Sequence, residues 1–265
     1  ADVCAADAMI EITQLSKRFT QGRGGKARTV QAVADLSFRA DDGRITGLLG
    51  PNGAGKTTTL RMAAALIEAD TGRITVDGID IAREPQRALA RMGVLSDARG
   101  LYPRLTAREN IVYYGRLQGM SAQAASARAD ALAHMLEMTP LLERRTEGFS
   151  QGERMKTALA RAIVHDPPNL ILDEPTNGLD VLATRALRES LRRLRDDAGK
   201  CIVFSTHIMQ EVERLCDRVV LVSHGRTVAE GSVDELNARC GQSDCAETFV
   251  QLAFTPDARH VEQGR

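Results

Sequence analysis

The stretch Gly50-Pro51-Asn52-Gly53-Ala54-Gly55-Lys56-Thr57 decides the fold, because it joins an apolar run, Ile45 to Gly50, to a helix-like pattern from Thr57 to Ile67. It matches the Walker A pattern, in which glycines let backbone amides approach phosphate oxygens closely. The helix N-terminus adds partial positive charge, Lys56 reaches the β- and γ-phosphates, and the Thr57 hydroxyl can bind Mg²⁺. The flanking strand and helix disfavour a chance match. The predicted phosphate-binding residues are Gly50, Pro51, Asn52, Gly53, Ala54, Gly55, Lys56, Thr57 and Thr58.

Strand-like and helix-like patterns alternate around this loop, which predicts an α/β domain with a largely parallel sheet. Between roughly Leu101 and His165 the strand signals vanish. Thr106 and Glu109 form a capping-box pair there, and apolar residues recur at helical spacing. A helical insertion therefore interrupts the α/β domain. The expected strands are 73–77, 169–172, 201–205 and 218–222, and the expected insertion helices include 121–138 and 153–164.

Composition excludes several classes of protein. The 265 residues carry 35 basic and 35 acidic side chains, so no chain-wide field attracts nucleic acid, and we expect no nucleic-acid partner. The longest apolar run, Met62 to Ile67, is far short of the ~20 residues of a spanning helix, which predicts a soluble chain. The N-terminus lacks a secretory pattern. Five scattered cysteines are expected to be reduced cytosolic thiols, and Cys240 and Cys245 lack the spacing of a zinc site.

Two adjacent acids, Asp173 and Glu174, follow the buried strand-like run that begins at Asn169. Open α/β sheets bind ligands at the carboxyl ends of their strands. We expect Asp173 to hold Mg²⁺ opposite Thr57, and Glu174 to polarise the water that attacks the terminal phosphate. An acid pair at a solvated strand end is the alternative, and the phosphate-binding loop favours the catalytic interpretation.

Three further segments resemble motifs of the ABC ATPases. Phe149-Ser150-Gln151-Gly152-Glu153 is similar to the LSGGQ signature, Pro175-Thr176-Asn177-Gly178-Leu179-Asp180 resembles the D-loop, and His207 falls where the family has its switch histidine. The resemblance runs in the family's order from about Ile10 to Leu236. It implies a P-loop NTPase (RecA-like) core with a mainly parallel sheet, an N-terminal antiparallel β subdomain and a helical insertion.

The resemblance also implies boundaries and a second binding surface. The ATPase domain would span 8–236, with its core at 8–95 and 166–236, the helical insertion at about 98–165 and a C-terminal tail at 237–265. Ser150 and Glu153 read equally as a capping box for the next helix. In the family that helix end faces the γ-phosphate of ATP bound to the opposite subunit. Ser150, Gln151, Gly152 and Glu153 would then complete a site in trans, within a head-to-tail dimer around two ATP molecules.

Three single residues receive roles by resemblance. His207 would sense the γ-phosphate as a catalytic residue beside Glu174 and Lys56, although a lone histidine is commonly structural. Phe19 would stack on adenine, although a phenylalanine near a strand end often packs in a core. Asp180 would contact the other subunit, although it is equally plausible as the N-cap of the helix from Val181.

The sequence departs from the family at two places. Asp97 stands where the Q-loop normally has glutamine; its carboxylate can still approach Mg²⁺ but cannot donate an amide hydrogen bond. The departure puts in doubt how the Q-loop couples the core to the helical insertion; it does not put nucleotide binding in doubt. The signature has Phe149 for leucine, Gln151 for glycine and Glu153 for glutamine, changes expected to tune the site.

The resulting expectation is an ATP-binding and ATP-hydrolysing subunit of an ABC transporter, peripheral at the cytoplasmic face of the membrane. It would dock on separately encoded permease subunits through the helical insertion and the loop from Asp97 to Tyr102. The segments 96–110 and 149–152 are similar to sodium-exporting (NatA-type) subunits, which favours export. A non-transport ABC ATPase and a regulatory module with little turnover stay open. Neither long heptad repeats nor a second cassette is present, and Glu174 and His207 are intact.

Overall fold

The computed structural model describes residues 9–21, 28–96 and 100–240. Ten strands form one sheet in the order β5-β4-β1-β2-β10-β9-β3-β8-β7-β6. They are β1 (Ile10–Gln21), β2 (Arg28–Ala40), β3 (Ile45–Leu49), β4 (Thr71–Val76), β5 (Ile79–Asp80), β6 (Met92–Leu95), β7 (Asn169–Asp173), β8 (Cys201–Thr206), β9 (Arg218–Ser223) and β10 (Arg226–Gly231). The helices are α1 (Lys56–Ala63), α2 (Pro85–Leu89), α3 (Ala107–Leu117), α4 (Ala122–Met135), α5 (Gln151–Ala162), α6 (Val181–Asp196), α7 (Met209–Leu215) and α8 (Val233–Cys240), with a 3-10 turn η2 (Thr139–Leu141).

The parallel part of the sheet forms the centre of the fold. Strand β3 pairs in parallel with β8 and β9, and β7 pairs in parallel with β8 and β6. Every residue of β3, β7 and β8 is buried, because helices cover both faces. Alternate residues face two different cores: Leu170 and Leu172 pack with the helices α5 and α6, whereas Ile171 packs with α1. The predicted parallel α/β core is confirmed.

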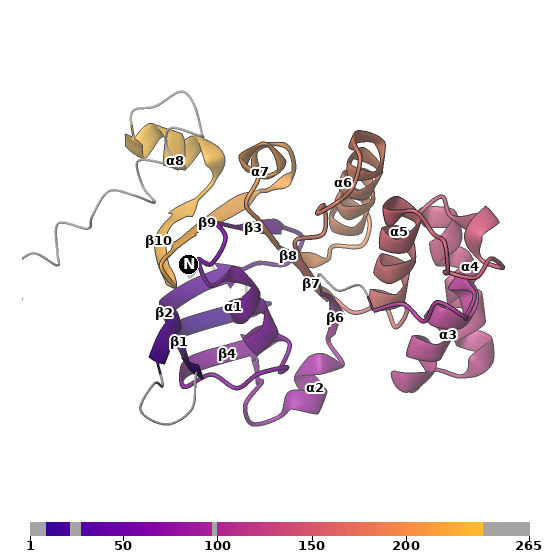
Figure 1. Cartoon of the computed structure of the whole chain (residues 1–265), viewed down its shortest axis with the longest axis horizontal. Coiled ribbons are helices and arrows are strands. Elements are labelled where there is room, and N and C mark those ends of the chain that lie inside the picture. Colours follow the sequence, from indigo (N-terminus) through magenta and orange to yellow (C-terminus); the bar gives the residue numbers. More distant parts are fainter. Residues whose placement is uncertain (1–8, 22–27, 97–99, 241–265) are drawn as a thin grey trace, which may run out of the picture.

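Four strands from the N-terminal part of the chain, β1, β2, β4 and β5, form the end of the sheet opposite β6. Strand β1 pairs antiparallel with β2 and β4, and β4 with β5. A single parallel register pair, Arg226 with Asp35, joins β10 to β2. Figure 1 shows this group beside α1, away from the helices of the insertion. It brings β2 next to the phosphate-binding loop that follows β3, where Ala32 and Val33 lie against Gly55.

Helix α1 ends four residues earlier than the predicted Ile67, at Ala63. Ala65 adopts the left-handed conformation with φ 52°. Its N–H donates to the carbonyl of Met62, and the N–H of Leu66 donates to the carbonyl of Arg61. These are the two bonds of a Schellman motif, which normally uses glycine at the left-handed position. The helix stops because its last carbonyls are satisfied this way, a signal that the alanine-rich sequence does not carry.

The helical insertion contains α3, α4, η2 and α5 and lies to one side of the sheet (Figure 1). Two predicted capping boxes are confirmed: Thr106 with Glu109 at α3, and Ser150 with Glu153 at α5. Ile111, Ala129 and Leu159 come from three of its helices and share one buried core. Each α-helix of the insertion begins at a side-chain cap, and the insertion shares its core with β7 and β8.

Two predictions concern residues that lie partly or wholly outside the described part of the chain. The predicted tail boundary after Leu236 falls inside α8, which continues to Cys240, and 241–265 lie outside the described residues. Asp97 also lies outside them. Within the described part of the chain no helix is both long and apolar enough to cross a membrane.

Candidate functional site

The loop between β3 and α1 needs glycine at specific positions. A Cβ on Gly50 would lie 2.3 Å from the carbonyl oxygen of Val222, and one on Gly55 would lie 2.5 Å from that of Ala32. Gly55 also has φ 104°, and Gly53 has φ 82°. Gly55 is the N-cap of α1 and offers no side-chain acceptor to the first-turn amides. These N–H groups are therefore presented to a ligand, as phosphate binding at a helix N-terminus requires.

Lys56 is buried against the same loop. Its Nζ donates hydrogen bonds to the carbonyls of Gly50 at 2.7 Å and Pro51 at 3.1 Å. Nζ also lies 3.5 Å from Oε1 of Glu174. Burial lowers the pKa of Lys56, whereas the carboxylates of Glu174 and Asp173 raise it. Burial thus opposes the charge, and the two carboxylates favour it.

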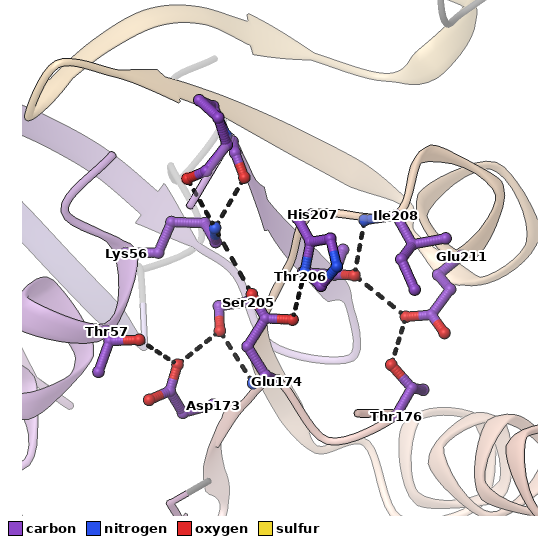
Figure 2. A network of polar contacts seen from close by, with 12 residues as sticks. Lys56, Thr57, Asp173, Glu174, Thr176, Ser205, Thr206, His207, Ile208 and Glu211 are labelled. Carbon is purple, nitrogen blue, oxygen red and sulfur yellow. Dashed lines mark hydrogen bonds and ion pairs between the residues drawn. The ribbon is translucent and has the colours of Figure 1, made fainter. Parts of the chain in front are cut away.

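Asp173 ends β7 and faces the start of α1. The Thr57 hydroxyl donates to Oδ1 of Asp173 at 3.0 Å, and the Ser205 hydroxyl donates to the same oxygen at 2.7 Å (Figure 2). Hydroxyl and carboxylate oxygens are the donors that Mg²⁺ prefers, and Mg²⁺ characteristically uses few protein ligands alongside substrate phosphates. The residues therefore fit a Mg²⁺ ion held between Thr57 and Asp173.

Glu174 sits at the start of the next loop with a left-handed backbone, φ 45°. Its N–H donates to Oγ of Ser205 at 3.0 Å, so one hydroxyl holds both acids of the pair. Nδ1 of His207, after β8, lies 3.0 Å from Oε2 of Glu174. The two carboxylate oxygens of Glu174 therefore have different partners, Lys56 on one side and His207 on the other. Figure 2 shows these contacts converging from α1, β7 and β8.

A cavity of about 650 Å³ collects these side chains. Asp173, Glu174 and His207 line it together with the loop. Phe19 on β1 and Val30 on β2 also line it; they pair directly across the two strands and are 37% and 38% exposed. The site therefore has a polar end at the loop and an apolar edge at Phe19 and Val30. The phosphate-binding residues from the sequence that line it are Asn52, Gly53, Ala54, Gly55, Lys56, Thr57 and Thr58.

The signature and Asp180 lie elsewhere in this chain. The Ser150 hydroxyl accepts from the N–H of Glu153, and the Glu153 carboxylate accepts from the N–H of Ser150. Asp180 accepts from the N–H of Ala183 and so caps α6. Among the described residues that line the cavity, none belongs to 150–153, and Asp180 is also absent. The fold thus assembles the residues around Lys56 into one cavity and leaves Ser150 and Gln151 exposed outside it.

Four residues in or next to this site were not predicted from the sequence: Val30, Ser205, Thr206 and Glu211. Ser205 ends an apolar strand-like run, and the two adjacent hydroxyl residues at that end, Ser205 and Thr206, are the signal that could identify it. Val30 became visible only through its pairing with Phe19. Thr206 immediately precedes His207, and Glu211 lies on α7, which begins two residues after His207.

Comparison with known proteins is consistent with this geometry. Residues 33–177 match the family model described as ABC transporter. The chain is 43% identical over 229 residues to the ABC transporter ATP-binding protein NatA of Bacillus subtilis (strain 168), covering 86% of this chain and 91% of that protein. It is 42% identical over 225 residues to the Nod factor export ATP-binding protein I of Burkholderia lata, covering 85% and 71%.

Two solved structures resemble the fold. One, described as the ATP binding subunit of an ABC transporter, has a TM-score of 0.79 and 30% identity, and the match covers 92% of this chain and 99% of that chain. The other is a dimeric, post-hydrolysis state of the ATP-binding cassette MJ0796 bound to ADP and Pi, with a TM-score of 0.76, 23% identity and coverage of 84% and 98%. At that identity its likeness concerns the fold. The chain therefore belongs to the ABC transporter family and is an ATP-binding, ATP-hydrolysing subunit of a transporter.

Proposed function

We propose that Glu174 is the base that activates water for ATP hydrolysis, and that this reaction drives export through separate membrane subunits. The observation that carries the proposal is the placement of the Glu174 carboxylate, held between Lys56 and His207 in the cavity that the phosphate-binding loop lines. A carboxylate fixed on both sides can orient one water molecule toward a phosphate at the loop.

The roles of the other residues follow from their positions. Lys56 and the free amides of the loop bind the β- and γ-phosphates, and the apolar edge at Phe19 and Val30 receives the adenine. Thr57 and Asp173 would hold Mg²⁺, which neutralises phosphate charge when bound. Glu174 accepts a proton as the water oxygen bonds to the γ-phosphorus, and the bond from that phosphorus to the bridging oxygen of ADP breaks. His207 holds Glu174 and contacts the γ-phosphate.

The active assembly is a head-to-tail dimer. Ser150, Gly152 and Asp180 lie outside the cavity of their own chain, so a second copy supplies them to it. The capped N-terminus of α5 suits a phosphate, because its helix dipole presents partial positive charge. The dimeric state of the MJ0796 cassette, which shares the fold, supports this assembly. ATP closes the dimer and hydrolysis releases it.

The membrane partners are separately encoded permease subunits at the cytoplasmic face, and they dock on the helical insertion. Tyr102, Tyr113 and Leu117 lie on this insertion and are 45%, 44% and 63% exposed, apolar surface that a partner can cover. Export is favoured by similarity to NatA and to a Nod factor export protein. Sodium ions are the proposed cargo, on the likeness of segments 96–110 and 149–152 to sodium-exporting subunits.

The deciding experiment is Glu174→Gln. We expect this variant to bind ATP with nearly wild-type affinity, to lose at least 100-fold in steady-state phosphate release and to accumulate as an ATP-bound dimer in light scattering. Glu213→Gln, an exposed acid on α7, is the matched control and should behave as wild type. Normal turnover by Glu174→Gln would remove Glu174 from the mechanism. Purification from native membranes tests the partners: recovery of ribosomes or DNA without a polytopic protein would contradict the transport role.

A further inference from the structure

A second buried carboxylate, Glu211 on α7, lies behind the catalytic acids. Its side chain is 7% exposed. The hydroxyl of Thr176 donates to Oε2 of Glu211 at 2.7 Å, and the hydroxyl of Thr206 donates to the same oxygen at 3.2 Å. Figure 2 shows Glu211 on the far side of His207 from Lys56. None of the three residues lines the nucleotide cavity, so Glu211 does not bind ATP directly.

The two threonines belong to the loops that carry Glu174 and His207. Thr176 follows Glu174 by two residues, and Thr206 immediately precedes His207. The Thr206 hydroxyl also accepts the N–H of Ile208 at 3.0 Å, so it brackets the backbone on both sides of His207. One carboxylate oxygen therefore joins the two segments whose side chains meet in the 3.0 Å contact between Glu174 and His207.

Burying the carboxyl group of Glu211 costs free energy of desolvation, which packing alone does not explain. Burial raises the pKa of Glu211, against the hydrogen bonds from Thr176 and Thr206 and the nearby positive charge of Arg188. An apolar residue of similar volume would avoid the desolvation cost. A buried carboxylate that accepts hydrogen bonds from both the Thr176 loop and the end of β8 can hold these two segments in a fixed relative position.

We propose that Glu211 is a positioning residue for ATP hydrolysis, which ties the Thr176 loop to the Thr206 strand end and so sets the distance between Glu174 and His207. The inference rests on the catalytic roles proposed for those two residues. Without the tie, each loop still folds, but the carboxylate and the imidazole lose their fixed separation. Small misplacements of catalytic groups lower the rate without removing the substrate site.

The test compares variants of the full chain by kcat, KM for ATP and melting temperature. Glu211→Met removes the acceptor and keeps a similar volume; we expect kcat to fall by about 10- to 100-fold, KM to stay within about twofold and the melting temperature to fall modestly, because two buried hydroxyls lose their acceptor. Glu211→Gln keeps an oxygen that accepts both hydroxyls, and we expect it to retain kcat within about threefold. Glu213→Met on the exposed face of the same helix is the control.

Thr176 provides an independent variant if Glu211→Met does not fold. Thr176→Val should lower kcat without changing KM, and Thr176→Ser, which keeps the hydroxyl, should restore it. Wild-type kcat in Glu211→Met or in Thr176→Val overturns the inference, as does a loss of kcat that is matched by lost ATP affinity. Glu174→Gln measured alongside separates the two proposals: if it loses turnover while Glu211→Met does not, only the role of Glu211 fails.

Discussion

Glu174 and His207 meet through Oε2 and Nδ1 at 3.0 Å, although 33 residues separate them in the chain. The other oxygen of the same carboxylate faces Lys56. Glu174 is 14% exposed and His207 41%, so the acid is held inside while the imidazole reaches the cavity. The contact joins the end of β7 to the end of β8, which lie next to each other in the sheet. It places His207 between Glu174 and the cavity that the phosphate-binding loop lines.

His207→Ala should therefore lose turnover rather than ATP binding. We expect kcat to fall by about 100-fold or more, because the base loses its support and the phosphate loses a contact, while KM changes by only a few-fold. Steady-state phosphate release measures both constants. His134→Ala, on the exposed face of α4, is the control. Wild-type turnover in His207→Ala would show that the contact is structural.

Mixing two inactive variants tests whether Lys56 of one subunit and Ser150 of the other act on the same ATP molecule. Ser150→Asp keeps a good N-cap for α5 but places negative charge where a phosphate would lie, and Lys56→Ala disables the loop. Each variant alone should be inactive. An equal mixture should recover about one quarter of the wild-type rate, because half of the dimers contain one intact site out of two.

The control mixture pairs Lys56→Ala with the double variant Lys56→Ala/Ser150→Asp, in which every site lacks a working loop. It should stay inactive. Full activity of Ser150→Asp by itself, or no recovery in the first mixture, would show that the signature does not act on the nucleotide of the other subunit.

His165 should make folding sensitive to acid. Burial lowers its pKa, outweighing the hydrogen bond to the carbonyl of Met92, and Lys200 lowers it further against Asp166. Because the folded chain holds this proton less tightly than the unfolded chain, stability falls as pH drops below the ordinary histidine range. Melting temperatures between pH 5 and 8 should fall less steeply in His165→Gln than in wild type. Parallel curves for the two proteins would contradict this, and His134→Gln supplies the exposed control.

Ala65 is a position where glycine should stabilise the fold. It is exposed and left-handed at the end of α1, and an alanine there costs about 1 kcal/mol or more relative to glycine. We expect Ala65→Gly to raise the free energy of unfolding by about 0.5–1 kcal/mol after the entropy of glycine is counted. The change Ala63→Gly, at the buried last residue of α1, adds backbone freedom and removes a packed methyl group, and it should lower the free energy of unfolding by about 1 kcal/mol. Urea unfolding measures both, and a loss of stability in Ala65→Gly would contradict the assignment.

Many helix starts and buried strands could be predicted from the sequence, because the interactions that define them join residues close together in the chain. The capping residues Thr106, Ser150 and Asp180 each bond an amide three residues away, so their spacing predicted the starts of α3, α5 and α6. The apolar runs of β3 and β7 predicted buried strands for the same reason. The end of α1 was predicted wrongly, because alanine seldom adopts the left-handed conformation that Ala65 has at this helix end.

The sequence by itself determined the phosphate-binding loop, because close approach of backbone to phosphate demands glycines beside Lys56 and Thr57 within eight consecutive residues. The tertiary structure alone decided which distant groups meet there. Parallel pairing of β7 with β8 sets Asp173 opposite Ser205, and only that register lets one hydroxyl hold both acids. The reason is physical: an amide cradle forms within one turn of chain, whereas a hydroxyl shared between strands depends on their order and register in the sheet.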